Sequence, residues 1–257
     1  MPLMNLRPRL TISTIALTLF VAGIVWCGWG LRDARRSALA STAQSPLNQL
    51  NLALANYEDR YGTFPPAYTT DQNGRPMHSW RALILPYVGC PEIYEQYDYS
   101  EPWDGPNNSK LANQMPSCFL SATEPPSTSH TNVVALTGPG TVFPRADGTR
   151  LKDIADRPQN TILLVEITNS QIPWLAPIDL PAEEAIAAWN TTQQPGISAV
   201  SWRRPLVCFC DRQAAYSLSR TLTKENLRAM TTIAGGEPVS QDRLIQDRQI
   251  RRGVWIE

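Results

Sequence analysis

The densest group of side chains that could bind a ligand lies in a short stretch rich in proline and glycine. It consists of three acids and two amides: Asp98, Glu101, Asp104, Asn107 and Asn108. Closely spaced carboxylate and amide oxygens on a turn are the ligands that calcium prefers, although this spacing does not match an EF-hand loop. The stretch is therefore a possible calcium site. The alternative is turn chemistry, in which Asp104 and Gly105 form a bend and Asn107 or Asn108 caps the following helix.

Cysteines form a second group with possible chemistry. Four of the five lie outside the apolar N-terminal segment, namely Cys90, Cys118, Cys208 and Cys210. In an oxidising compartment they allow three pairings, of which we prefer a disulfide between Cys90 and Cys118. Cys208 and Cys210 are two residues apart in an expected strand, so their side chains face the same way and a direct bond would be strained. Cys-x-Cys also lacks the ligand gap typical of zinc sites. Buried free thiols are the alternative.

The sequence contains no recognisable catalytic context. Its only histidines are His78 and His130, and a hydrolase would need one of them beside a nucleophile. There is no phosphate-binding glycine loop, no Gly-x-Ser-x-Gly and no His-Glu-x-x-His motif. We therefore predict that the protein is not an enzyme and needs no cofactor, calcium at the acidic turn being the one possible exception.

Aromatic side chains offer a binding alternative. Five tryptophans, Trp80, Trp103, Trp174, Trp189 and Trp202, could line a groove for a glycan or peptide, or could instead anchor irregular loops in the core. Aromatic side chains clustered in one groove would favour a receptor. Tryptophans dispersed through the core would favour a structural protein.

Composition excludes two further classes. The 257 residues include 23 Lys and Arg against 23 Asp and Glu, with an isoelectric point near 6.7. This balance argues against a disordered acidic chain and against a general nucleic-acid binder. The charge is nevertheless uneven. Residues 1–36 hold five arginines and one aspartate, a net charge of +4, and the remainder carries −4.

The N-terminal segment predicts a membrane anchor. Residues 10–31 contain no charged side chain, and a helix of that length spans the ~30 Å hydrocarbon core of a bilayer. A cleaved signal peptide is disfavoured because arginines separate the apolar run from the small residues that follow. We thus expect a tail at 1–9, a transmembrane helix at 10–31, a basic juxtamembrane segment at 32–46 and a folded domain at 47–257. The lipid bilayer is the expected partner.

The rest of the chain predicts an α+β domain. Apolar residues spaced by three or four form one helical stripe that ends before Gly62: Leu47, Leu50, Leu54, Tyr57 and Tyr61. Residues 63–129 read as a loop-rich insertion, with a short helix or strand at Trp80–Val88 and a helix after Asn108. Strands are expected at Thr131–Leu136, Thr161–Ile167, Ala199–Trp202 and Leu206–Phe209, and short helices at Pro181–Asn190 and Thr223–Ala234, the last capped by Thr223.

Several motifs occur in an order typical of one family. They are the run from Leu47 to Ala67, Met77–Arg81, Leu85–Tyr87, Tyr94–Asp98, Glu101–Asn108, Gly138–Thr141, Asn160–Leu163, Ile172–Trp174 and Gly235–Glu237. With them the chain resembles the bacterial prepilin-like proteins grouped as domain of unknown function 1559, over roughly residues 35–240. That family resembles type II secretion pseudopilins. The resemblance implies a transmembrane helix that continues into an amphipathic helix packed on a small antiparallel sheet, with loop-rich insertions. It also implies a domain outside the cytoplasmic membrane, residues 1–9 in the cytoplasm, and pilin-like or envelope proteins as partners.

Two features depart from the family pattern. Prepilin-type members have a Gly cleavage site, a Phe after it and a Glu in the mature helix, whereas Asn5–Leu10 offers neither Gly nor Phe and the apolar run has no acid. The family's C-terminal signature is a His, nine residues and then Asp-Gly. Here Asp211 is retained, but Ser201 replaces the His and Arg212 replaces the Gly. We therefore expect a non-enzymatic, membrane-anchored envelope protein with a structural or interaction role; the alternative is a tethered receptor for envelope glycan, peptide or calcium.

Overall fold

The computed structural model describes residues 46–120, 127–190, 196–198 and 204–253. The chain divides into two units, residues 1–39 and 40–257, and every described residue lies in the second. The expected tail, transmembrane helix and nearly all of the juxtamembrane segment therefore lie outside the described residues. Within the described ranges, no helix is both long enough and apolar enough to cross a membrane.

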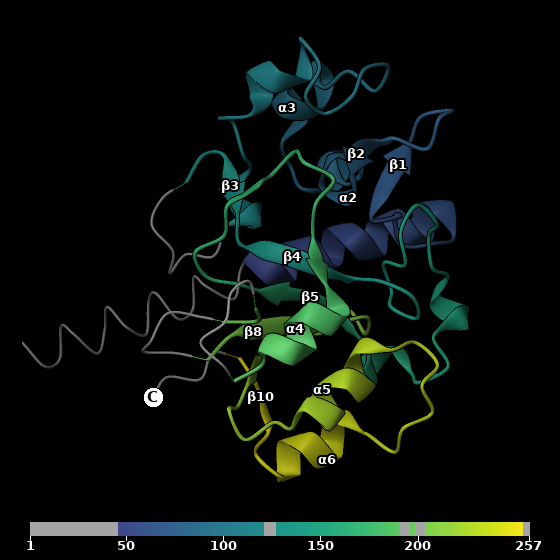
Figure 1. Cartoon of the computed structure of the whole chain (residues 1–257), viewed down its shortest axis with the longest axis vertical. Coiled ribbons are helices and arrows are strands. Elements are labelled where there is room, and N and C mark those ends of the chain that lie inside the picture. Colours follow the sequence, from purple (N-terminus) through teal and green to yellow (C-terminus); the bar gives the residue numbers. More distant parts are fainter. Residues whose placement is uncertain (1–45, 121–126, 191–195, 199–203, 254–257) are drawn as a thin grey trace, which may run out of the picture. The chain divides into compact units, whose positions relative to one another are not determined.

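A six-stranded sheet lies at the centre of the domain, in the order β10-β9-β8-β5-β4-β7 (Figure 1). Its strands are β4 (Val133–Thr137), β5 (Ile162–Glu166), β7 (Leu180–Pro181), β8 (Leu206–Phe209), β9 (Tyr216–Leu218) and β10 (Ile250–Arg252). The predicted strands near β4, β5 and β8 are confirmed, and the one at Ala199–Trp202 lies outside the described residues. The expected antiparallel sheet needs one correction. β7 pairs parallel with β4, because the chain returns to the sheet edge through a long loop instead of a hairpin.

Both faces of this sheet are buried, which explains the near-continuous apolar runs of its strands. Successive residues of β4 alternate between two core clusters, with Val133 and Ala135 in the first and Val134 and Leu136 in the second. In β5 a register irregularity between Ile162 and Leu164 lets Leu163 and Leu164 join the same cluster. The sheet is therefore the middle layer of the domain.

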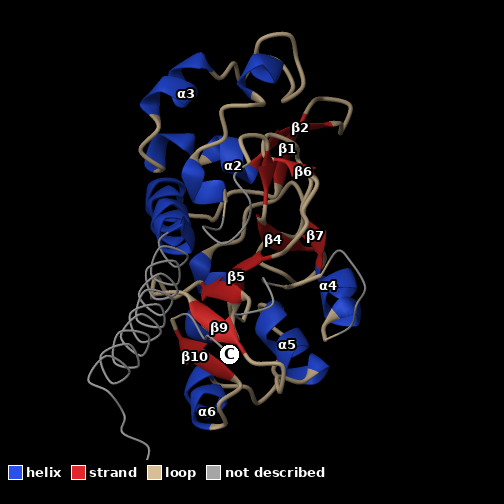
Figure 2. Ribbon diagram, turned by 90° about the vertical axis from the view of Figure 1, so that its left-hand side faces the viewer, coloured by secondary structure: helices blue, strands red, loops and turns tan. Residues whose placement is uncertain are grey.

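The N-terminal helix covers the first face. Its described part spans residues 46–61, and Leu47, Leu50, Ala53 and Leu54 are fully buried in the first core cluster. The predicted amphipathic helix is thus confirmed, and it ends at Gly62, whose φ of 76° suits a glycine. In Figure 2, strands β5 and β9 lie between this helix and α5.

Three short helices cover the second face: α4 (Ala182–Ala188), α5 (Lys224–Thr231) and α6 (Gln241–Gln246). Most of their buried apolar residues belong to the second core cluster: Ala182, Ala185, Ile186, Leu227, Met230 and Leu244. The predicted cap of α5 is confirmed, because the Thr223 hydroxyl accepts a hydrogen bond from the Asn226 N–H at 3.1 Å. The helix ends at Thr231, three residues earlier than expected.

The segment expected to be loop-rich contains short elements. They are β1 (Tyr68–Thr70), β2 (Pro76–Ser79), α2 (Trp80–Leu83), η1 (Leu85–Tyr87), α3 (Pro91–Gln96), η2 (Asn108–Leu111) and η3 (Ser117–Phe119). β3 (His130–Thr131) pairs with β6 (Ile172–Pro173), and single turns η4 (Leu151–Asp153) and η5 (Pro158–Asn160) follow the sheet's first strand. The ambiguous stretch Trp80–Val88 is therefore helical.

Candidate functional site

The motif Met77–Arg81 forms the junction between β2 and α2. Ser79 ends the strand and caps the helix, since its hydroxyl accepts hydrogen bonds from the Arg81 N–H at 3.2 Å and from Arg81 Nη1 at 3.1 Å. The cap turns the next side chains inward. Trp80 and Arg81 are both fully buried, and the Arg81 guanidinium lies over the Trp80 ring at 4.7 Å.

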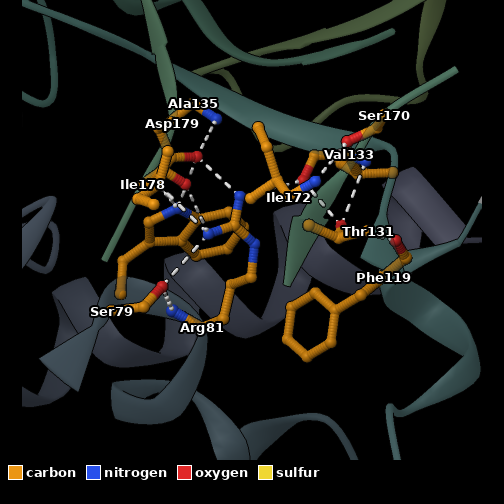
Figure 3. Close-up of polar contacts among 11 residues, drawn as sticks. Ser79, Arg81, Phe119, Thr131, Val133, Ala135, Ser170, Ile172, Ile178 and Asp179 are labelled. Atoms are coloured by element: carbon orange, nitrogen blue, oxygen red, sulfur yellow. Dashed lines mark hydrogen bonds and ion pairs between the residues drawn. The ribbon is translucent and has the colours of Figure 1, made fainter. Parts of the chain in front are cut away.

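Asp179 supplies the counter-charge for the buried arginine (Figure 3). Its Oδ1 accepts a hydrogen bond from Arg81 Nη2 at 2.6 Å and from the Ala135 N–H of β4 at 2.8 Å. The Trp80 indole N–H lies 3.1 and 3.2 Å from the two carboxylate oxygens. Arg81 Nη2 also donates to the Val133 carbonyl at 3.3 Å. One carboxylate thus connects α2, β4 and the segment preceding β7.

The buried charges of Arg81 and Asp179 are compensated only when both side chains are present. The side chains of Arg81 and Asp179 are 0% and 2% exposed. Complete burial raises the pKa of the Asp179 carboxyl, whereas the Arg81 guanidinium and the Ala135 N–H act in the opposite direction. Removing either partner would leave an uncompensated charge in the core, which is much costlier than never burying the pair.

Two cavities share this segment in their lining. Their volumes are about 650 and 600 Å³, and both are lined by Ile178, Asp179 and Pro181. These volumes fall within the range of small-molecule pockets. However, the Asp179 carboxylate, the acid that the two linings share, is fully engaged by interior donors. The Asp179 carboxylate therefore holds the fold together and is not free for chemistry in either cavity.

The acidic turn uses its oxygens internally. Glu101 Oε1 accepts hydrogen bonds from the Asn107 and Asn108 N–H groups at 2.7 and 2.6 Å. The fully buried Asn108 accepts from the Asp98 N–H at 2.8 Å, and its amide donates to the carbonyls of Asp98, Glu101 and Pro102 at 2.8 to 3.3 Å. Gly105 fits closely, since a Cβ there would lie 2.6 Å from the Glu101 carboxyl carbon.

This geometry corrects the expected cap and does not support the calcium interpretation. Neither Asn107 nor Asn108 caps η2 with its side chain; Glu101 satisfies those N–H groups from outside the helix. Asp98 is turned toward Ser100, whose N–H and hydroxyl both donate to its Oδ1 at 2.8 and 2.6 Å. In the part of the chain that the structure describes, no group of three or more His, Cys, Asp or Glu side chains could hold a metal.

Cys90 and Cys118 are free thiols in the structure and do not form the disulfide that we preferred. They lie in one core region, because Cys90 packs against the cluster that contains Cys118. Burial raises the pKa of the Cys118 thiol to about 12, and the neighbouring Cys90 adds to the effect. Cys208 and Cys210 pack into this same cluster, as their shared strand face predicts. All four correspond to the free-thiol alternative.

Each histidine shares a side-chain hydrogen bond with a hydroxyl group, and the Asp98 carboxylate acts electrostatically on His78. His78 Nδ1 lies 2.8 Å from the Tyr97 hydroxyl, and His130 Nδ1 lies 3.0 Å from the Ser129 hydroxyl. Burial lowers the pKa of His78. The prediction that the protein is not an enzyme is not tested by this arrangement and stays a prediction.

Tryptophans are dispersed through the core. Trp80, Trp174 and Trp189 are at most 3% exposed, and the latter two donate their indole N–H groups to the carbonyls of Ala112 and Leu222 at 3.1 and 2.8 Å. Trp103 is half-buried against the first cluster, and Trp202 lies outside the described residues. Among the described residues, they therefore form no common groove.

Taken together, these observations define an α+β domain whose most elaborate polar site is a buried ion pair. Residues 32–144 match the sequence profile of a family described as protein of unknown function (DUF1559). The family predicted from the motifs is thereby confirmed over that segment, which is less than half of the chain. No curated protein and no solved structure matches the chain.

Arg81 lies inside the matched segment and Asp179 outside it. The motif around Arg81 can be recognised in the sequence, but its partner Asp179 cannot, because the two residues are 98 positions apart. No local pattern around Asp179 marks it as buried; the only signal is an acid between two prolines, Pro177 and Pro181.

The departure at Arg212 has a structural counterpart. Arg212 adopts a φ of 60°, a left-handed conformation that favours the glycine expected at this position. Its guanidinium contacts the carboxylates of Glu58 at 3.1 Å and Asp59 at 2.6 Å, both on the N-terminal helix. Ser201, at the expected His position, lies outside the described residues.

Proposed function

We propose that this chain is a non-enzymatic, membrane-anchored, pseudopilin-like envelope protein with a structural or interaction role. Residues 10–31 anchor it in the cytoplasmic membrane, and the α+β domain lies outside. The support comes from the uncharged N-terminal run, the amphipathic helix that packs on the sheet and the DUF1559 match.

One observation supports the structural role: three tryptophans and one Arg–Asp pair make their polar contacts inside the fold. Trp80, Arg81 and Asp179 bind one another, and Trp174 and Trp189 donate to backbone carbonyls. A domain organised in this way is a rigid scaffold.

Topology is the first experiment. Membranes from cells that express the chain with a C-terminal tag would be isolated, the intact mass determined, and spheroplasts treated with external protease beside a cytoplasmic marker protein. We expect full-length mass, membrane retention and loss of the tag while the marker survives. A protected tag would overturn the orientation, and a mass lacking the N-terminal residues would show pilin-like processing.

The alternative role, a tethered receptor, is favoured by one specific feature. Several tyrosines, unlike the tryptophans, are exposed at the surface near the end of the N-terminal helix: Tyr61, Tyr94 and Tyr99.

A further inference from the structure

Six tyrosines from different parts of the chain form one aromatic group, in which Tyr97 is buried in the core and the other five reach the surface to different degrees. They are Tyr57, Tyr61, Tyr87, Tyr94, Tyr97 and Tyr99, which we call the tyrosine surface. Ring centroids are 4.4 Å apart for Tyr57 and Tyr61, 6.3 Å for Tyr57 and Tyr87, 6.4 Å for Tyr94 and Tyr99, and 4.8 Å for Tyr97 and Tyr99. These distances are typical of interacting aromatic pairs.

The turn η1 joins the two halves of this surface, because its Tyr87 ring lies 6.3 Å from that of Tyr57 on the N-terminal helix and η1 itself contacts α3. Burial raises the pKa of Tyr87, and Tyr61 and Tyr94 raise it further. Burial likewise raises the pKa of Tyr99, to which Tyr94 and Tyr61 add. The C-terminal end of the N-terminal helix therefore lies close to α3 and the residues after it.

Much of the surface faces solvent. Tyr61, Tyr94 and Tyr99 are 61%, 42% and 40% exposed. α3 has no buried residue, although its Ile93 packs partly on the core. Exposed rings at the end of the N-terminal helix, on α3 and shortly after α3 are typical of an interaction surface, where tyrosine is enriched.

All charged side chains in the segment that carries Tyr87, Tyr94, Tyr97 and Tyr99 are acidic. Residues 82–109 contain no Lys, Arg or His, and they contain five acids: Glu92, Glu95, Asp98, Glu101 and Asp104. Glu92 and Glu95 are exposed on α3, and within the described residues neither forms an ion pair with a basic side chain. Arg60, beside Tyr87, is the cation at the edge of the surface.

This combination selects the partner's chemistry. Tyrosine faces attract Lys and Arg cations, and unpaired carboxylates add to that attraction. A nucleic acid or an anionic membrane would be repelled, and a neutral glycan would gain nothing from the acids. We propose that the tyrosine surface docks an arginine- and lysine-rich segment of another protein. This inference rests on the proposed interaction role and names the class of its partner.

The experiment uses the full chain in detergent and a fluorescein-labelled peptide of alternating arginine and glycine, with fluorescence anisotropy as the readout. The matched peptide carries glutamate in place of arginine. We expect saturable binding of the arginine peptide alone, weakened between about 20 and 500 mM salt because exposed charges are screened.

Three variants locate the binding. Tyr61→Ala with Tyr94→Ala removes exposed rings, and Glu92→Gln with Glu95→Gln removes two charges; each should weaken binding by about tenfold or more. Glu225→Gln with Asp242→Asn is the control, because it removes two exposed acids on α5 and α6 and should leave binding unchanged. Circular dichroism confirms that each variant is folded.

Several results would overturn the proposal. Equal weakening of peptide binding by the Glu92→Gln/Glu95→Gln variant and the control variant would show attraction by net charge alone. If the tyrosine variant lost binding but the Glu92→Gln/Glu95→Gln variant did not, the surface would recognise its partner without using a cation. Self-association abolished by the same variants would assign the surface to a second copy, whose residues 32–36 are basic. Failure of peptide binding in a chain whose topology test succeeds would refute this inference and leave the proposed anchor intact.

Discussion

At the scale of single residues, Arg212 shows how a side chain can compensate for an unfavourable backbone. Its φ of 60° costs a non-glycine residue conformational energy, while its guanidinium links the turn after β8 to Glu58 and Asp59 of the N-terminal helix. The loss of the family's glycine is thus accompanied by a contact that a glycine could not make.

Two substitutions separate these effects. Arg212→Ala removes the ion pairs and keeps the strained backbone, whereas Arg212→Gly removes both the ion pairs and the strain. We therefore expect the glycine variant to exceed the alanine variant in free energy of unfolding by about 1 kcal/mol. Urea denaturation of both variants provides the measurement. Equal stability would mean that the left-handed conformation carries no cost here.

Thiol accessibility is a second residue-scale prediction. Because burial raises the pKa of Cys118 and Cys208 to about 12, and that of Cys210 well above its ordinary value, we expect these three not to react with iodoacetamide in the native protein. Cys90 is half-buried and should react first, and all four should react in denaturant without reductant. Peptide mass mapping reads out the result. A Cys90–Cys118 peptide resistant to alkylation would restore the disulfide.

At the scale of elements, one substitution can distinguish two interpretations of the turn at residues 98–108: a loop held by its own hydrogen bonds, or a cation site. Asn108→Asp would add a carboxylate and thereby strengthen calcium binding. In the observed loop it removes an amide that donates to three carbonyls, and it places a charge among them at a fully buried position. We expect a loss of about 1–3 kcal/mol in unfolding free energy, with calcium and a chelator changing the melting temperature of neither protein.

Local patterns predicted the elements that are long or strongly periodic. The stripe from Leu47 to Leu54 and the apolar runs of β5 and β8 identify their elements because burial on one or both faces leaves a short-range signal. β7 has two residues, and its parallel pairing with β4 depends on a loop that carries no such signal. A strand as short as β7 is defined by its pairing with β4 and not by a pattern in its own sequence.

The candidate sites were harder to predict for the same reason. The motif containing Arg81 was visible, but its counter-ion Asp179 reaches it only through the folded chain. The tyrosine surface was missed because Tyr57 and Tyr61 read as part of a helix stripe, while Tyr94 and Tyr99 belong to a separate segment. Proximity between such segments is a property of tertiary structure.

At the scale of the whole molecule, His78 predicts how stability depends on pH. Its folded-state pKa lies below the ordinary value near 6.5, because it is buried beside Tyr97. Such a group contributes stability that is fully present above pH 6.5 and is lost as the pH falls toward its lower folded-state pKa. The free energy of unfolding should therefore decrease between pH 7 and 5. His78→Gln should flatten this decrease; an unchanged slope would assign it to other groups.

The buried ion pair connects the family-matched segment to the rest of the domain, so its removal tests whether the two parts fold as one unit. Asp179→Asn leaves the Arg81 guanidinium without a counter-charge at a position with 0% exposure, and we expect a loss of about 3–5 kcal/mol in unfolding free energy by urea titration. Asp153→Asn is the matched control, because its ion pair with Arg150 is exposed and its removal should have no measurable effect. Arg81→Met combined with Asp179→Asn should recover part of the loss, since no charge then remains buried. Additive losses in the double variant would instead show that Arg81 and Asp179 stabilise the domain independently through their backbone contacts.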